Sequence, residues 1–201
     1  GSGLTPTVHA APLYLEGKLT ITGLVEHQLN LSSAELAAMP KTTVNAAIIC
    51  VDYPGYVVTE GNWVGVSLGL LLETAGASPS AVKVAFFASD GYSTDLTLET
   101  AMREDVILAY EKDDVPLSEG LRLVVPGKWG YKWISQVASI ELVDYDFKGF
   151  WESRGYSDDA DIDGSVPEFP SVTFLLMPLI VIALFMLMLK KKAKLGRPFK
   201  P

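Results

Sequence analysis

The chain has 201 residues, of which 49% are hydrophobic and 20% are charged, and its formal net charge at pH 7 is −8. That length and composition suffice for one globular core, and they exclude a chain that is disordered throughout. The charge is divided unequally. Residues 190–201 hold 6 of the 16 basic residues and no acidic one, so residues 1–171 carry 10 basic against 24 acidic side chains, a charge of −14. Such an acidic surface argues against a nucleic acid as the partner.

The first predicted elements are a strand and a short helix. Residues 1–12 are expected to be a flexible lead. Alternation of apolar and polar side chains then predicts a half-buried strand over residues 15–25. Ser32 and Glu35 have the spacing of a capping box, which predicts a helix that begins there and ends at Pro40.

A continuous apolar run, VNAAIICV, occupies residues 44–51. Its length and composition predict a central strand that is buried on both faces, with Cys50 at its end. The turn-forming sequence DYPG at residues 52–55 follows, and then a short strand over residues 56–59.

A second helix and several strands complete the domain. Residues 68–75 place three leucines on one helical face, and Gly76 supplies a left-handed stop. The Asp-Gly pair within SDGYS, residues 89–93, predicts a tight turn. Further strands are predicted over residues 82–88, 106–112, 121–125 and 137–143.

The rest of the chain predicts a tether to a membrane. Residues 13–156 form the predicted strand-dominated α+β domain, and residues 157–171 are an acidic, proline-containing linker. Residues 172–189 are 18 residues without a charge, which predicts one transmembrane helix. The lysine-rich residues 190–201 predict a cytoplasmic tail, so the domain is expected outside the cytoplasm on a cell membrane.

Several motifs, in order, resemble the oxidoreductase molybdopterin-binding domain of the sulfite oxidase superfamily. They are IICV, NWVGVSLGLLLETAG, VKVAFFASDGYS, DVILAY, PLSEGLRLVVPGKWGYKWISQV and GFWESRGYS. The resemblance covers about residues 15–156. The turn VVPGKWGYKW is most similar to that of the catalytic subunits of periplasmic methionine-sulfoxide reductases and of small membrane-anchored prokaryotic relatives. The resemblance implies a sulfite-oxidase-type molybdopterin-binding fold.

The resemblance also implies site residues. Cys50 matches the cysteine whose thiolate binds molybdenum or tungsten in a molybdopterin cofactor, and soft sulfur suits such a metal. Lys128, Gly130, Tyr131 and Lys132 match the loop that lies against the pterin and its phosphate. Two plainer interpretations stay open from the residues alone: Cys50 as a small buried apolar residue, and the turn as an ordinary hairpin with solvated lysines.

Two functions follow. The first is a membrane-anchored extracytoplasmic oxidoreductase that exchanges electrons or oxygen atoms with a small substrate. Because the chain has one cysteine and no CxxCH haem motif, a partner protein is expected to supply or accept the electrons. Sulfite is the least favoured substrate, because an acidic domain repels a dianion. The alternative is a cofactor-free binding or structural subunit of a membrane or cell-surface complex.

Overall fold

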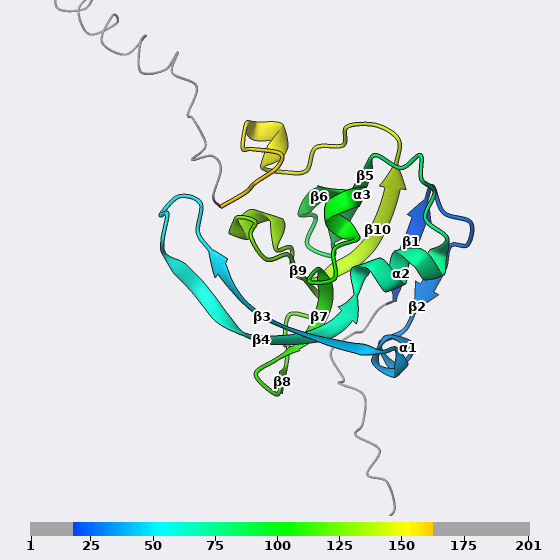
Figure 1. The fold of residues 1–201 in the computed structure, drawn as a ribbon, viewed down its shortest axis with the longest axis horizontal. Coiled ribbons are helices and arrows are strands. Elements are labelled where there is room, and N and C mark those ends of the chain that lie inside the picture. The colour runs from blue at the N-terminus through cyan, green and yellow to red at the C-terminus, as the bar shows by residue number, and fades with distance from the viewer. Residues whose placement is uncertain (1–17, 163–201) are drawn as a thin grey trace, which may run out of the picture. The chain divides into compact units, whose positions relative to one another are not determined.

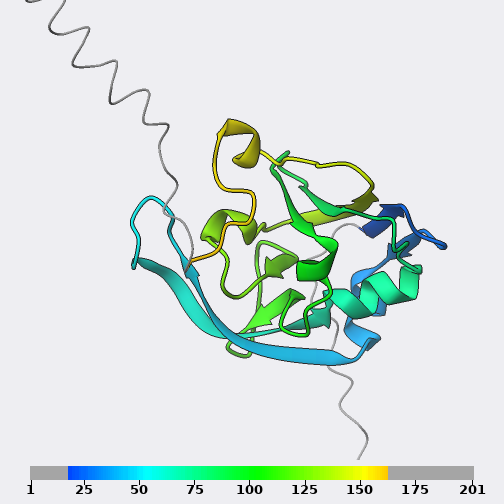
Figure 2. The same cartoon turned by 45° about the horizontal axis from the view of Figure 1, so that its top comes forward.

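A computed structural model describes residues 18–162, and the strands of this part form two five-stranded sheets (Figures 1 and 2). The first sheet has the order β2 (Leu29–Leu31), β1 (Leu19–Gly23), β10 (Val137–Val143), β5 (Lys83–Ala88) and β6 (Ser93–Thr97). The second has β3 (Lys41–Ile49), β4 (Val57–Ser67), β7 (Ile107–Lys112) and β8 (Val115–Pro116) in order, with β9 (Arg122–Val124) also paired to β7. The pair β1–β10 is parallel and the other pairs are antiparallel.

The helices are short. They are α1 (Ser33–Ala38), α2 (Leu68–Ala75), α3 (Leu98–Ala101) and the 3₁₀ turns η1 (Gly130–Lys132) and η2 (Glu152–Arg154). The predicted capping box is confirmed, since Ser32 and Glu35 cap each other across the first turn of α1. The predicted second helix is confirmed at both ends: the Ser67 side chain caps the start of α2, and Gly76 ends it at φ 69°.

The core lies where the inner faces of the sheets meet α2. Leu71 and Leu72 of α2 are fully buried, as are Phe86 of β5 and Ile140 of β10. Strand β4 approaches β7 very closely at Gly65, where a Cβ atom would lie 2.0 Å from the carbonyl oxygen of Leu108. A side chain at this position would force the two strands apart.

The prediction that residues 44–51 form a strand buried on both faces is wrong. Strand β3 pairs with β4 alone among the described strands, and its residues alternate between exposed and half-buried along most of its length. The predicted short strand at residues 56–59 is the start of the 11-residue β4. Figures 1 and 2 show why the hairpin is exposed: its end extends beyond the other strands of the domain. Polar residues of β4 such as Glu60 and Asn62 are therefore exposed to solvent there.

Residues 157–162, which the sequence assigned to the linker, pack against the domain. Ala160 is fully buried, and its carbonyl oxygen accepts a hydrogen bond from the Trp129 N–H at 2.8 Å. The predicted lead at residues 1–12, membrane helix at 172–189 and tail at 190–201 lie outside the described residues. Within residues 18–162, no helix has the length and apolarity needed to cross a membrane.

Candidate functional site

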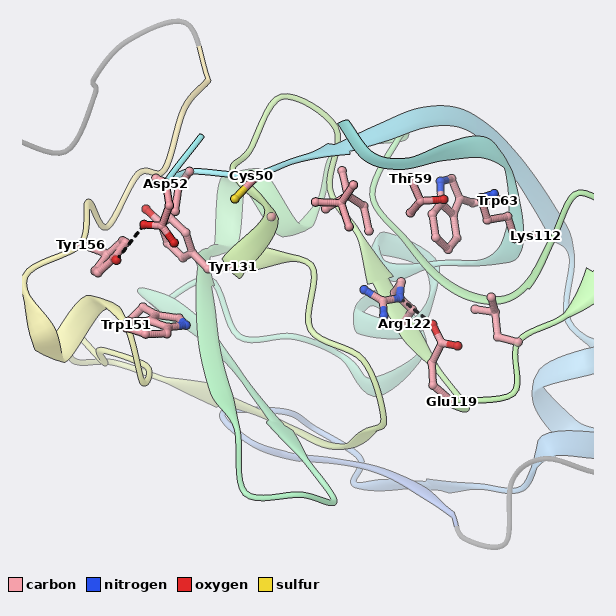
Figure 3. Close-up of a pocket in the computed structure, with 15 residues that line it drawn as sticks. Cys50, Asp52, Thr59, Trp63, Lys112, Glu119, Arg122, Tyr131, Trp151 and Tyr156 are labelled. Atoms are coloured by element: carbon pink, nitrogen blue, oxygen red, sulfur yellow. Dashed lines mark hydrogen bonds and ion pairs between the residues drawn. The ribbon is translucent and has the colours of Figure 1, made fainter. Parts of the chain in front are cut away.

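Cys50 follows the last residue of β3 and lies on the wall of a cavity of about 520 Å³ (Figure 3). The loop that holds it is fixed by the Cys50 N–H, which donates to the Tyr56 carbonyl at 3.0 Å, and by the Tyr56 N–H, which donates to the Tyr53 carbonyl at 2.9 Å. The Cys50 side chain is half-buried rather than enclosed by aliphatic neighbours. The thiol is therefore available to a group bound in the cavity.

Next to Cys50 the cavity wall is aromatic and carries one carboxylate (Figure 3). The ring of Tyr156 packs edge-on against Tyr131, at 5.5 Å between ring centroids, and in a tilted arrangement against Trp151, at 4.9 Å. The Tyr131 hydroxyl donates to the Ser157 carbonyl at 2.6 Å, and the Tyr156 hydroxyl donates to Asp52 Oδ1 at 3.2 Å. Burial, followed by nearby carboxylates, raises the pKa of Tyr131 above its usual 10.0, so its phenol stays protonated.

The other side of the cavity carries two basic side chains, and both are already paired. Arg122 donates through Nε to Glu119 Oε1 at 2.9 Å and through a terminal nitrogen to the Trp133 carbonyl at 3.0 Å. Lys112 Nζ lies 2.9 Å from Asp113 Oδ2. The positive charge at this wall is thus largely compensated by the protein itself.

Lys132, predicted to face the cofactor, points instead into the interior. Its Nζ atom lies 2.7 Å from Glu152 Oε1 and 3.3 Å from Asp95 Oδ1, and it donates to the Asp95 carbonyl at 2.9 Å. Lys83 joins the same cluster, 2.7 Å from Asp95 and 2.6 Å from Asp158. The two ammonium groups therefore neutralise most of the charge of the buried Asp95 and Glu152, and Lys83 shares the half-buried Asp158 with Lys148.

The electrostatics of this cluster differ between its members. Burial raises the pKa of Asp95, and the lysines beside it oppose that rise only in part. For Asp158, burial also raises the pKa, but the hydrogen bond and charge of Lys83, together with the charges of Lys132 and Lys148, outweigh it and lower the pKa from 3.8. The cluster connects β5, β6, η1 and the segment after η2, so its effect is to fix the turn that forms one wall of the cavity.

The predicted loop residues divide into two groups. Gly130 and Tyr131 line the cavity together with Cys50, whereas Lys128 and Lys132 do not line it. Lys128 is buried, and its Nζ atom lies 2.7 Å from Asp161 Oδ1. Both ammonium groups therefore form ion pairs with acidic side chains from distant parts of the chain. The contact of these lysines with a cofactor phosphate stays a prediction.

Gly130 has a steric role in the cavity wall. A Cβ atom at this position would lie 3.0 Å from the Ile49 carbonyl oxygen and 3.0 Å from Ile48 Cγ2. The glycine therefore lets the turn that begins η1 pack closely against the end of β3, directly before Cys50. This contact brings two segments 80 residues apart in the chain to the same wall.

The sequence did not reveal the partners that complete the site. Trp151 and Tyr156, in the motif GFWESRGYS, pack against each other and also line the cavity. Asp95 and Glu152 carry no recognisable spacing relative to Lys132. One signal was present in the sequence: a lysine in an apolar turn needs acidic partners if it is buried, which indicates nearby carboxylates without saying which ones.

A strand-dominated α+β domain that presents one thiol to a large cavity is suited to a metal-containing cofactor held by a single soft protein ligand. Comparison with known protein families and structures identifies the family of this domain. The chain belongs to the oxidoreductase molybdopterin binding domain family, whose model matches residues 9–151. The predicted membership of the sulfite oxidase superfamily is thereby confirmed.

Three similar proteins illustrate the relationship. The uncharacterized oxidoreductase YuiH of Bacillus subtilis (strain 168) is 31% identical over 142 residues, which are 69% of this chain and 71% of that protein. A putative protein-methionine-sulfoxide reductase subunit, YedZ1 of Azospira oryzae, is 29% identical over 70% of this chain and 54% of its own length. The sulfane dehydrogenase SoxCD from Paracoccus pantotrophus has a similar fold, with a TM-score of 0.59 and 27% identity over 70% of this chain. This chain covers 40% of that SoxCD chain, so its relatives extend well beyond the shared domain.

The cavity fits a molybdopterin cofactor in size and donor chemistry. Its volume of about 520 Å³ lies within the roughly 300–1,000 Å³ typical of cofactor and ligand pockets. The chain's one cysteine supplies a soft donor on its wall, and aromatic rings beside the thiol offer a flat apolar surface. Cys50, Gly130 and Tyr131 are the predicted residues whose positions agree with such a group.

Proposed function

We propose that this chain is a membrane-anchored, extracytoplasmic molybdopterin oxidoreductase domain that exchanges electrons or oxygen atoms with a small substrate through a partner redox protein. The observation that carries the proposal is the half-buried Cys50 thiol on the wall of a cavity of about 520 Å³. The family membership supports the cofactor. The name of one relative, a putative protein-methionine-sulfoxide reductase subunit, supports a partner protein.

Each wall of the cavity has a part in this function. Bound molybdopterin supplies a metal that cycles between oxidation states, and Cys50 is proposed as its protein ligand. Gly130 permits the close approach of the η1 turn, and Tyr131 covers the site with its ring while its hydroxyl is held by the Ser157 carbonyl. Trp151 and Tyr156 limit the access of water on that side.

The charges of the cavity favour an uncharged substrate over sulfite. Arg122 and Lys112 are paired with Glu119 and Asp113, and Asp52 adds a negative charge near the thiol. A dianion entering this cavity would have to displace those carboxylates, whereas a neutral oxide would not. We therefore place a small uncharged oxygen-atom donor or acceptor ahead of sulfite.

Metal analysis tests this proposal. Full-length protein purified from its native membrane is expected to contain molybdenum or tungsten in near-stoichiometric amount, and Cys50→Ser is expected to lose it while keeping the wild-type circular dichroism spectrum. Val82→Ser, at an exposed residue that does not line the cavity, serves as the matched control and should keep the metal. Wild-type metal content in Cys50→Ser would refute the assignment of the ligand.

A second candidate function is a cofactor-free binding or structural subunit of a membrane complex. The observation that favours it is the pairing of Lys128 with Asp161 and of Lys132 with Glu152, which leaves neither ammonium group available for a phosphate. A folded native protein without molybdenum or tungsten would support this alternative and contradict the first.

The membrane anchor is proposed from the apolar residues 172–189 and the basic residues 190–201. Carbonate extraction of native membranes should leave the chain in the membrane fraction. Protease added to spheroplasts with a sealed cytoplasmic membrane should digest the domain and spare the C-terminal tail. Release by carbonate would contradict the anchor, and digestion of the tail alone would reverse the proposed orientation.

A further inference from the structure

The end of the β3–β4 hairpin, residues 51–58, includes most of the connecting loop and the first two residues of β4. It exposes an unusual set of apolar side chains, and we call it the hairpin tip. Tyr53 is 72% exposed, Tyr56 62%, Val58 55% and Val57 40%. Figures 1 and 2 show that this end of the hairpin projects away from the sheets. Burial of large apolar side chains against a partner surface is favourable, because it removes their apolar area from water.

The described chain ends beside the base of the hairpin tip. Ile162 and Val51 both pack against the cluster formed by Trp129, Tyr131 and Ala160. The Ile162 N–H donates to the Gly127 carbonyl at 2.9 Å, which fixes this last part of the described chain. The last described residue therefore lies on the side of the domain that carries Val51 and the base of the tip.

Covalent geometry limits how far the tip can be from an anchored segment. The apolar run of residues 172–189 begins ten residues after Ile162. At no more than about 3.6 Å per residue, those ten residues span at most about 36 Å. If a bilayer holds residues 172–189, Ile162 therefore lies within about 36 Å of the start of that segment.

We propose that the hairpin tip rests on the lipid surface, with Tyr53 and Tyr56 at the level of the headgroups. This inference rests on the anchor proposed above. Tyrosine is enriched at membrane interfaces because its ring is apolar and its hydroxyl stays hydrated. Residues 51–58 contain one charged side chain, Asp52, and no basic one, so the contact is apolar and does not require anionic lipids.

The proposed contact also orients the cavity. Val51, Asp52 and Val58 belong to the tip and line the cavity as well. A tip that rests on lipid therefore places this part of the cavity wall, next to Cys50, near the membrane surface. Reactants or redox partners carried by the membrane then reach the site over a short distance.

Paramagnetic relaxation in lipid nanodiscs tests the contact. Isotope-labelled full-length protein is placed in discs of zwitterionic lipid that contain a small share of a gadolinium-chelating lipid. The amide signal of Gly55, between the two tyrosines, is expected to lose most of its intensity. The amide of Ala38, exposed at the end of α1, is the internal control and should keep its intensity, because β3 separates it from the tip by about 26 Å at ~3.3 Å per residue.

Variants separate the tip from the anchor. In Tyr53→Ser/Tyr56→Ser, whose altered residues do not line the cavity, the loss at Gly55 should disappear while the protein still floats with liposomes. Tyr145→Ser, at an exposed tyrosine outside the tip, should retain the wild-type loss.

The outcomes are distinct. Flotation with equal relaxation at Gly55 and Ala38 overturns the tip contact and leaves the anchor standing. Failure of the wild-type chain to float overturns the anchor, and the tip contact with it. If the Gly55 amide is unrelaxed in pure lipid but protected from hydrogen exchange in native membranes, the tip binds a protein partner and the lipid proposal is wrong.

Discussion

Replacement of Lys132 by methionine removes the central positive charge of the interior cluster with little change in side-chain volume. The Lys132 side chain is 1% exposed, and its ammonium group lies 2.7 Å from Glu152 and 3.3 Å from Asp95. In the variant, Asp95 still has Lys83 at 2.7 Å, but Glu152 keeps only the hydroxyl of Thr94 at 2.7 Å as a partner. A fully buried carboxylate is then left without a counter-charge.

The expected cost follows from that geometry. Breaking a buried ion pair by removing one partner costs about 3–5 kcal/mol, against a total stability of about 5–15 kcal/mol for a domain. In urea, with a slope of about 2 kcal/mol per M, the midpoint of unfolding should fall by roughly 1.5–2.5 M. Tryptophan fluorescence of the full-length protein in mild detergent can follow the transition.

Two further variants make this prediction specific. Lys112→Met removes a lysine whose side chain is 23% exposed and whose partner, Asp113, is 48% exposed, so it should cost at most about 1 kcal/mol. Adding Glu152→Gln to Lys132→Met should recover part of the loss, because it removes the uncompensated charge. The reasoning is refuted if Lys132→Met unfolds within about 1 kcal/mol of Lys112→Met. A stable Lys132→Met protein that loses its metal would show that Lys132 holds the cofactor after all.

Two other predictions concern pH and packing. Because Lys83 lowers the pKa of Asp158 from 3.8, the charged carboxylate stabilises the fold above about pH 4, and this stabilisation is lost as the pH falls through the lowered pKa. Asp158→Asn should therefore weaken the acid-side fall of the unfolding free energy, and an unchanged pH profile between pH 2 and 5 would contradict the ion pair. Gly65→Ala should lower the melting temperature markedly, since its Cβ would meet the Leu108 carbonyl oxygen at 2.0 Å and overpacking costs about 1–3 kcal/mol or more. Gly69→Ala, whose Cβ would have no atom nearer than 3.5 Å, should be neutral or stabilising in α2, and equal effects of the two alanines would contradict the close approach of β4 to β7.

The sequence determined the local elements whose causes are local. The capping box at Ser32 and Glu35 and the glycine stop at Gly76 depend on residues a few positions apart, and both occur as predicted. The tight turn of SDGYS likewise joins β5 to β6. The ordered motifs also identify the superfamily from the sequence alone.

The exposure of β3 depended on tertiary structure. The run at residues 44–51 has the composition of a central strand, yet β3 lies in a hairpin that extends from the domain and is half exposed. Composition reports how apolar a strand is, whereas the number of neighbours that cover it depends on where the sheet places it.

The same distinction separates the predicted site residues that line the cavity from those that do not. Cys50, Gly130 and Tyr131 could be placed at the cavity from their motifs, because short turns fix where they face. The direction of the Lys132 side chain depended on Glu152 and Asp95, which lie 20 and 37 residues away in the sequence. A buried lysine pairs with carboxylates that lie close to it in space, and their identity depends on the tertiary structure.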